Sequence, residues 1–265
     1  MFPEERQQKI YKIVTQRRSV KVSDLSNELE ISEATIRRDL EELQKQKRII
    51  RTHGGAMSAY FVGKAVTSSE LLYKDSELKQ QIAQIAYDMI DDHDTLLMDT
   101  SSTVHELIKL IASGTKSHLR VITTSLMAIE ALSKSRNCNV QLVGGDVNYE
   151  HQTCEGSVAC RFIRDIRVDK CFIGINGIDE SYGFSTPRYA DADIKSHMIE
   201  SSNCSILLAD HTKIGKTYLA KITEPDCLIT DCREMDFSYE MLGDNVDVIF
   251  AEERLPEQEP RQEKI

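Results

Sequence analysis

Residues 23–56 read SDLSNELEISEATIRRDLEELQKQKRIIRTHGGA, and the spacing of apolar residues in this stretch decides the fold of the N-terminal part. Leu25 and Leu29 stand four residues apart behind Ser23, whose hydroxyl is suited to cap the start of a helix. A turn follows, and Ser32 is predicted to cap a longer amphipathic helix whose apolar positions are Ile36, Leu40 and Leu43. The pattern predicts two helices that are joined by a tight turn and share one core.

The outward face of the second predicted helix carries side chains that suit nucleic acid. Once the apolar residues face the core, this face presents Ala34 and Arg38, with Thr35 and Arg37 beside them in the first two turns. A helix that enters the major groove contacts bases and phosphates with these turns, and an arginine can pair with guanine or hold a phosphate. The alternative is a solvated face whose arginines pair with neighbouring glutamates.

The segment that follows favours the DNA-binding interpretation. Residues 48–56 alternate basic and apolar side chains and end in paired glycines and an alanine, which predicts a two-stranded wing. Arg48, Arg51 and His53 would then be free to reach the DNA backbone or the minor groove.

These motifs resemble those of a known family. Ser32-x-x-Thr35-Ile36-Arg37-Arg38-Asp39-Leu40, followed by Arg51-x-His53-Gly54-Gly55-Ala56, closely resembles the signature of the DeoR family of bacterial transcriptional regulators. The earlier Glu5-Arg6-Gln7-x-x-Ile10 is similar to the first helix of that family. From the helix geometry and this resemblance together, the predicted DNA-binding residues are Ser32, Ala34, Thr35, Arg37, Arg38, Arg51 and His53.

Charge and length indicate a division of the 265-residue chain. Residues 1–57 carry a net charge of +3 and the remainder carries −13, which together give the overall −10. A basic DNA-binding domain joined to an acidic second domain is consistent with this difference in charge, although ordinary scatter in charge could also produce it. We predict a DNA-binding domain over 1–57, a linker over 58–75, an effector-binding and oligomerisation domain over 76–251, and a disordered tail over 252–265.

The sequence also limits the compartment and the redox chemistry. No stretch approaches the ~20 apolar residues of a membrane span, and the N-terminus lacks the pattern of a signal peptide, which favours a cytoplasmic protein. The seven cysteines include no C-x-x-C pair and have apolar neighbours, which favours reduced thiols over disulfides or zinc; a redox-sensing thiol is the alternative. The histidines show no metal-binding spacing either, so we predict neither a metal nor a cofactor.

Beyond residue 77, short apolar runs alternate with helix-like stretches. This alternation predicts βαβ units and therefore a mostly parallel sheet flanked by helices. The predicted strands are 95–98, 120–123, 140–143, 171–175, 205–209 and 227–230. The predicted fold is thus α/β, with a small N-terminal winged helix-turn-helix domain and a larger C-terminal sheet domain whose ligands bind at the carboxyl ends of the strands.

Polar residues follow several of these strands. Asp99, Thr100, Ser101, Ser102 and Thr103 open a helix, where hydroxyls and free backbone N–H groups would suit a phosphate, although serine and threonine are also common helix caps. Further candidate effector-binding residues at other strand ends are Thr123, Gly144, Gly145, Asn176 and Lys213.

The region from 76 to 250 resembles the effector domain of DeoR-family regulators, which is related to ribose-5-phosphate isomerase. The resemblance implies a phosphorylated-sugar effector and adds Lys195 to its predicted contacts. An isomerase-like enzyme is the alternative function, but the acidic catalytic motifs of the isomerases are replaced here, for example by Gly174-Ile175-Asn176-Gly177. We therefore predict a DNA-binding repressor of a carbohydrate-catabolism operon that acts as a dimer or tetramer.

Overall fold

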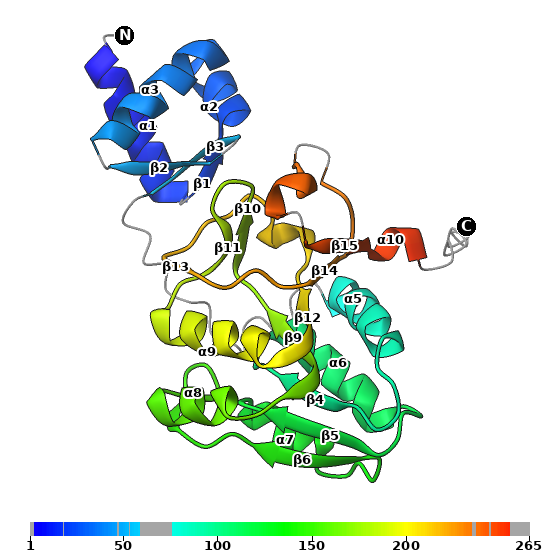
Figure 1. The fold of residues 1–265 in the computed structure, drawn as a ribbon. Coiled ribbons are helices and arrows are strands. Elements are labelled where there is room, and N and C mark those ends of the chain that lie inside the picture. The colour runs from blue at the N-terminus through cyan, green and yellow to red at the C-terminus, as the bar shows by residue number, and fades with distance from the viewer. Residues whose placement is uncertain are drawn as a thin grey trace, which may run out of the picture.

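A computed structural model describes residues 3–17, 19–46, 48–52, 54–58, 76–234, 237–243 and 245–254. Figure 1 shows a small helical part with a short sheet of its own and a larger part built around a parallel sheet. His53, the predicted linker beyond residue 58 and the predicted tail beyond residue 254 lie outside the described residues. Within the described ranges, no helix has both the length and the apolar character needed to cross a membrane.

The small part is a winged helix-turn-helix, which confirms the predicted fold. Its helices are α1 (Pro3–Arg17), α2 (Val22–Leu29) and α3 (Glu33–Lys45), and its strands are β1 (Ser19–Lys21), β2 (Ile49–Thr52) and β3 (Gly55–Ser58). The core contains the buried side chains of Leu25, Ile36, Leu40 and Leu43. Strand order is β1-β3-β2, so the wing has a third strand that the pattern of residues 48–56 does not indicate.

The start of α2 differs from the prediction. The helix begins at Val22, and Ser23 is an exposed residue of its first turn rather than its cap. Val22 is buried, and its N–H donates to Gly54 O at 2.7 Å, so the wing satisfies a group that a capping side chain would otherwise satisfy. Gly55 permits this approach, because a Cβ there would come within 2.1 Å of Val20 O.

The tight turn leads directly into α3. Glu30 adopts the left-handed conformation, with φ of 54°, and reverses the chain after α2. Ser32 holds the predicted N-cap position, and its carbonyl accepts from the N–H groups of Thr35 and Ile36. Its hydroxyl does not cap a backbone N–H group and lies 3.0 Å from Thr35 Oγ1 instead.

A buried ion pair fixes α3 against α1. Asp39 is 3% exposed, and its carboxylate accepts two bonds from the Arg6 guanidinium, one of them at 3.0 Å. Gln7 Nε2 adds a further bond at 3.4 Å. Removing one partner of such a pair would leave a charge buried without compensation. Asp39 and Arg6 therefore set the angle at which α3 presents its outer face.

Arg48 has a structural contact where the sequence suggested a free wing residue. Its guanidinium lies 4.0 Å from the centre of the Tyr11 ring on α1, close enough for a cation–π interaction. We expect Arg48→Ala to lower the free energy of unfolding by about 0.5–1 kcal/mol in urea denaturation, because this contact is lost. Arg51→Ala, which removes an exposed side chain of the same wing, is the control and should leave that stability within about 0.5 kcal/mol. Equal stability of the Arg48→Ala variant and the parent would contradict the structural role.

The larger part contains a fully parallel seven-stranded sheet, which confirms the predicted α/β class. Its strand order is β15-β14-β12-β9-β4-β5-β6. The strands are β4 (Thr95–Met98), β5 (Leu119–Thr123), β6 (Cys138–Leu142), β9 (Val168–Gly174), β12 (Ser202–Leu208), β14 (Cys227–Thr230) and β15 (Asp247–Phe250). Six of them match predicted strands, and β15 was not predicted.

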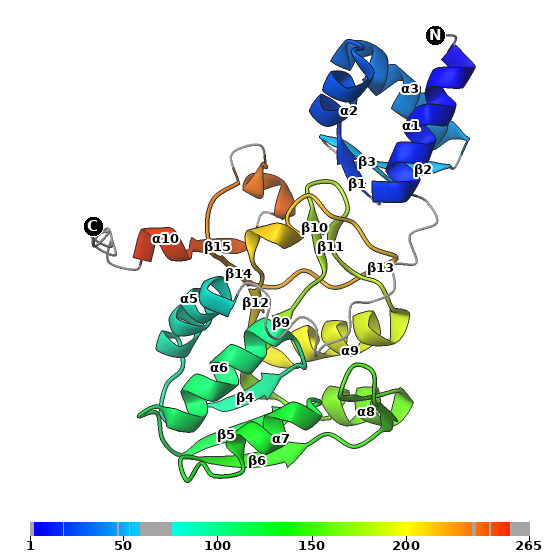
Figure 2. The same ribbon diagram turned by 180° about the vertical axis from the view of Figure 1, so that it is seen from behind.

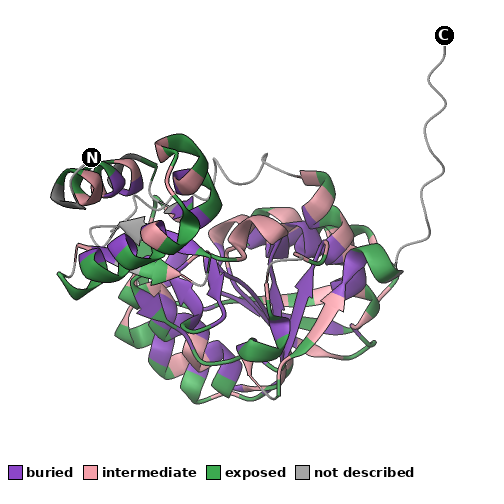
Figure 3. Ribbon diagram, turned by 90° about the horizontal axis from the view of Figure 1, so that it is seen from above, coloured by how far each residue is buried: buried purple, intermediate pink, exposed green. Residues whose placement is uncertain are grey.

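Helices cover both faces of this sheet (Figures 1 and 2). One face packs on α5 (Ser76–Asp88), α6 (Ser102–Ser113) and α7 (Leu126–Leu132), and the other on α8 (Ser157–Arg164) and α9 (Tyr189–Glu200). The buried strands lie between these layers (Figure 3). Phe172 points to the first core and Ile173 to the second, as alternation along a strand requires.

Short elements complete the large part. A second sheet with the order β10-β11-β13 joins β10 (Gly177–Asp179), β11 (Gly183–Thr186) and β13 (Ala220–Lys221), and β7 (Asp146–Asn148) forms a hairpin with β8 (Thr153–Glu155). Two 3-10 helices, η1 (His211–Lys213) and η2 (Tyr239–Leu242), follow β12 and β14. Helix α10 (Ala251–Arg254) includes residues that the sequence analysis assigned to the tail, because Ala251 is buried and the Glu252 N–H donates to Asp231 O.

Candidate functional site

The outer face of α3 presents most of the predicted DNA-binding residues to solvent. Ala34, Arg37 and Arg38 are exposed, and Thr35 is half-buried. Arg37 pairs with Glu33 at 2.9 Å, which is the solvated arrangement that the alternative interpretation expects for this residue. Such exposed pairs contribute little energy, so the pair is readily exchanged for a phosphate. Arg38 is the more direct candidate for a base contact.

The wing adds a second group of predicted residues. Arg51 is exposed on β2, and Thr52 pairs with Gly55 at the end of the hairpin. Ser32 is exposed at the start of α3, with its hydroxyl on Thr35. His53 lies outside the described residues, so its predicted contact remains a prediction.

A cleft lies at the carboxyl ends of β4, β9 and β12, where open parallel sheets bind their ligands. It brings together seven of the residues predicted for the effector, from four separate segments of the chain. These residues are Thr100, Ser101, Ser102, Thr103, Asn176, Lys195 and Lys213. The lining is completed by His151, Gly174, Ile175, Thr186, Pro187, Arg188, Asp191 and Leu208.

The start of α6 forms one wall of the cleft. Ser101 caps the helix, because its Oγ accepts from the Val104 N–H at 3.3 Å. Asp99 holds this loop from behind: its carboxylate accepts from the N–H of Ser101 and from the N–H of Gly174, each at 2.9 Å. Gly174 must be a glycine, since a Cβ there would lie 2.3 Å from Ser101 Cβ. Asp99 is therefore a supporting residue, and the cleft surface is formed by the residues that follow it.

Lys195 supplies a buried positive charge beneath the cleft. Its Nζ lies 2.5 Å from Asp99 Oδ2 and 3.4 Å from Asp191 Oδ1. Burial alone would lower its pKa, but the charges of Asp191 and Asp99 outweigh burial, so the pKa of Lys195 is raised. The lysine is charged at neutral pH and shared by two carboxylates.

Lys213 lines the cleft from η1. Its Nζ lies 3.6 Å from Asp210 Oδ2 and 3.3 Å from Thr212 Oγ1, and its side chain is 23% exposed. Burial tends to raise the pKa of Asp210, yet Lys213 and Thr212 lower it overall. This loosely held ammonium group faces the cleft and is better placed than Lys195 to exchange its present partner for an anionic ligand.

Sequence reasoning missed the wall opposite α6. Arg188 holds the N-cap position of α9 and forms a two-pronged ion pair with Glu155 on β8, at 3.0 and 2.6 Å. Thr186 Oγ1 lies 2.9 Å from Asn176 Oδ1 and 2.5 Å from Asp191 Oδ2. Thr186 ends β11 and Arg188 follows it, and the four residues of β11 are too short a run to be recognised as a strand from sequence.

Three predicted effector residues lie away from the cleft. Thr123 is fully buried, where its hydroxyl donates to Met98 O at 2.8 Å and accepts from the Ser125 N–H. Gly144 and Gly145 follow β6, the edge strand of the sheet, and a Cβ on Gly145 would meet Glu155 O at 2.5 Å. None of the three lines the cleft, although β5 lies next to β4 in the sheet, and their predicted effector contacts remain predictions.

The cysteines are free thiols, and several are poor candidates for redox sensing. Burial raises the pKa of the Cys171 thiol. Burial and Asp193 raise the pKa of Cys160 to about 11, and burial with nearby acidic groups raises that of Cys232 to about 11. Thiolates are the reactive form, so these three cysteines react slowly at neutral pH.

His211 beside Lys213 gives the fold a pH-dependent contact. Its Nδ1 lies 2.5 Å from Asp231 Oδ2, and the bond to Asp231 raises its pKa above the ordinary value, with Asp210 and Glu234 adding to the effect. A raised pKa in the folded state contributes stability that is complete below about pH 6.5 and disappears as pH rises through the folded-state pKa. We expect the Tm difference between the parent and His211→Gln to be larger in acid than in alkali. A pH-independent difference in thermal melts would contradict this contact.

Comparison with known proteins assigns both parts of the chain. Residues 6–60 match the DeoR-like helix-turn-helix domain, and residues 74–232 match the DeoR C terminal sensor domain. The HTH-type transcriptional repressor GlcR of Bacillus subtilis is 34% identical over 87% of this chain and 89% of its own. The lactose phosphotransferase system repressor of Streptococcus mutans is 30% identical over 89% of this chain and 94% of its own. Ribose 5-phosphate isomerase A of Methanocaldococcus jannaschii is 15% identical over 53% of this chain and 55% of its own, with a TM-score of 0.38.

Proposed function

Since the chain belongs to the DeoR family of transcriptional regulators, we propose that it represses a carbohydrate-use operon and that a phosphorylated sugar controls its binding to DNA. The observation that carries this proposal is the presence, in one chain, of an exposed basic face on α3 and a polar cleft lined by a helix N-terminus and lysines. The similarity to the lactose phosphotransferase system repressor of Streptococcus mutans supports the carbohydrate assignment.

For DNA, α3 enters the major groove with its first two turns. Arg38 contacts base edges, while Arg37 exchanges Glu33 for a phosphate and Thr35 contacts a base or a phosphate. The remaining proposed DNA-binding residues are Ser32, Ala34, Arg51 and His53.

For the effector, the first turn of α6 binds the phosphate. Thr100 to Thr103 offer hydroxyls and backbone N–H groups at the positive end of the helix dipole, and Lys213 provides a movable positive charge. Lys195 offsets part of the negative charge of Asp99 and Asp191 at the floor of the cleft, and Asn176 and Arg188 lie where they can bond sugar hydroxyls. This arrangement of donors suits a small, polar, dianionic ligand.

The chain is a regulator rather than an enzyme. Three aspartates near the replaced isomerase motifs, Asp179, Asp191 and Asp193, have other contacts. Asp191 shares Lys195, and Asp179 accepts bonds from the backbone of Ser181 and Tyr182. Asp193 lies beside Cys160.

The small size of the DNA-binding domain leads us to propose an oligomer. One short helix contacts few bases, so specific binding near ~10⁻⁸ to 10⁻¹¹ M requires at least a dimer on two half-sites. We assign DNA binding to residues 1–57, a linker to 58–75, effector binding and oligomerisation to 76–251, and a cytoplasmic location to the whole chain. The effector acts by favouring one arrangement of the DNA-binding domains within the oligomer.

A gel-shift titration tests the proposal. The purified chain is titrated at fixed salt onto the DNA upstream of its own gene, with and without a panel of phosphorylated sugars. We expect a specific shift that one sugar phosphate releases and that its unphosphorylated form does not. A specific shift that is indifferent to the whole panel would retain the DNA reader and reject the sugar-phosphate effector. Absence of a specific shift at any salt concentration would reject the operator.

A further inference from the structure

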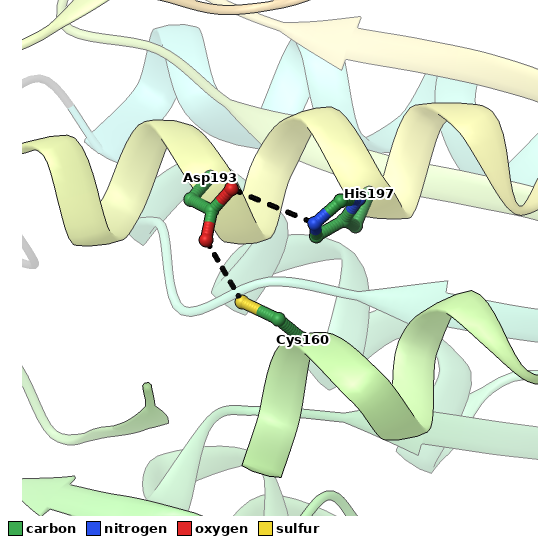
Figure 4. Close-up of side chains that lie close together, drawn as sticks. All are labelled: Cys160, Asp193 and His197. Carbon is green, nitrogen blue, oxygen red and sulfur yellow. Dashed lines mark hydrogen bonds and ion pairs between the residues drawn. The ribbon is translucent and has the colours of Figure 1, made fainter. Parts of the chain in front are cut away.

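Three side chains that commonly bind transition metals converge on the side of α9 away from the cleft. Figure 4 shows Cys160 of α8 pointing toward Asp193 and His197 of α9. Cys160 Sγ lies 3.3 Å from Asp193 Oδ2, and Asp193 Oδ1 lies 3.5 Å from His197 Nε2. One ligand atom from each residue lies within 4.8 Å of the other two.

These separations suit a single ion. Zinc binds thiolate sulfur, imidazole nitrogen and carboxylate oxygen at ~2.0–2.3 Å, so a tetrahedral ion holds its ligands roughly 3.3–3.7 Å apart. Each of the two separations falls in that range, but they involve different oxygens of Asp193, so the exposed Asp193 side chain must rotate to bring one oxygen to the ion.

A neighbouring carboxylate already orients the histidine. His197 Nδ1 lies 3.4 Å from Glu200 Oε2, which leaves Nε2 directed at Asp193. Metal-binding histidines usually donate their second ring N–H to such a carboxylate, which fixes the ring and its tautomer. Glu200 is therefore a positioning residue: it orients the His197 ring and is not itself one of the three ligands.

Exposure provides an entry path. Cys160 is 5% exposed, whereas the Asp193 side chain is 63% exposed and that of His197 is 19% exposed. An ion can therefore arrive from solvent on the Asp193 side and keep a water molecule as its fourth ligand.

We propose that Cys160, Asp193 and His197 bind one divalent transition-metal ion of the zinc class, with a water molecule as the fourth ligand. The thiol proton is released to solvent when the sulfur binds the ion. The bound ion joins α8 to α9, the helix whose opposite face places Asp191 and Lys195 at the cleft. This site lies outside the proposed effector contacts.

A second cluster, formed by His211, Asp231 and Cys232, is less suitable and serves as the internal control. Both oxygens of the buried Asp231 carboxylate are occupied by His211, one by its backbone N–H at 2.6 Å and the other by its ring at 2.5 Å. An ion there would have to break both bonds.

The test is a titration of the full-length, untagged, chelator-treated chain with Co²⁺, whose bonds to thiolate give a charge-transfer absorption in the near ultraviolet. The expected result is a band that saturates at one equivalent and is reversed by Zn²⁺. Cys160→Ser should abolish the band, and Cys232→Ser should leave it unchanged. Asp193→Asn and His197→Gln, at solvent-accessible positions, should weaken binding at least as much as Glu200→Gln, for which we expect roughly 10- to 100-fold.

Other outcomes overturn the proposal. No thiolate band in the parent would mean that no such ion binds. A band lost in Cys232→Ser but kept in Cys160→Ser would place the ion at the other cluster. A band that survives Asp193→Asn and His197→Gln at full affinity would reject the three-ligand site, and circular dichroism of each variant separates loss of ligands from loss of fold.

Discussion

Arg38→Ala should lose operator binding while its effector binding and oligomeric state stay those of the parent. A good arginine–guanine contact contributes about 1–3 kcal/mol, so a dimer that loses two of them loses about 2–6 kcal/mol, or at least roughly 30-fold in affinity. The side chain is exposed on α3, and its removal leaves the buried core of the small part intact. Gel-shift titration at fixed salt measures the change.

Lys45→Ala is the matched control for this experiment. It removes the same charge from the same helix, two turns farther along, where Lys45 pairs with Glu42 at 3.5 Å in solvent. We expect affinity close to that of the parent, because base contacts come from the start of the helix. If Lys45→Ala weakened binding as much as Arg38→Ala, general charge rather than a specific contact would explain binding.

Lys213→Ala should leave operator binding unchanged and reduce the response to the effector. A bond between a charged donor and a phosphate contributes about 1.5–3 kcal/mol, so roughly 10- to 100-fold more sugar phosphate should be needed for release. Lys195→Ala is a poorer probe, since removing it would leave Asp99 and Asp191 without their shared partner in the interior. Effector titration of the preformed DNA complex gives the measurement.

Lys221→Ala controls for loss of charge in the same part of the chain. Lys221 is half-exposed on β13, lies 3.9 Å from Glu224, and does not line the described cleft. Its variant should respond to the effector as the parent does. A normal response by Lys213→Ala would show that Lys213 does not bind the phosphate. The loop before α6 would then be the remaining candidate for the phosphate site.

Local spacing was sufficient to predict the main elements. Leu25 and Ile36 face one core because helical periodicity fixes their direction, and the apolar run at 171–175 falls largely within β9. The Asp99 to Thr103 loop was also correctly located after β4, because it directly follows a strand in sequence. Its exact ligand contacts remain a proposal.

Features that depend on contacts between distant parts of the chain could not be predicted from local spacing. Thr123 bonds to the carbonyl of Met98 and Gly145 packs against Glu155, and neither residue lines the cleft. Arg6 and Asp39 both stood in recognised motifs, yet nothing in their spacing of 33 residues indicated their ion pair. The same holds for Cys160 and Asp193, whose contact depends on how α8 packs against α9.

The single carboxylate of Asp99 joins the loop before α6, the end of β9 at Gly174, and Lys195 on α9. On a ribosome, the three segments emerge far apart in time, and the cleft cannot close until the last of them is synthesised. Synthesis of the winged-helix domain ends at Ser58, and residue 195 is added on the order of 10 s later at bacterial rates of elongation. A newly made chain is therefore able to fold its DNA reader well before it can sense an inducer.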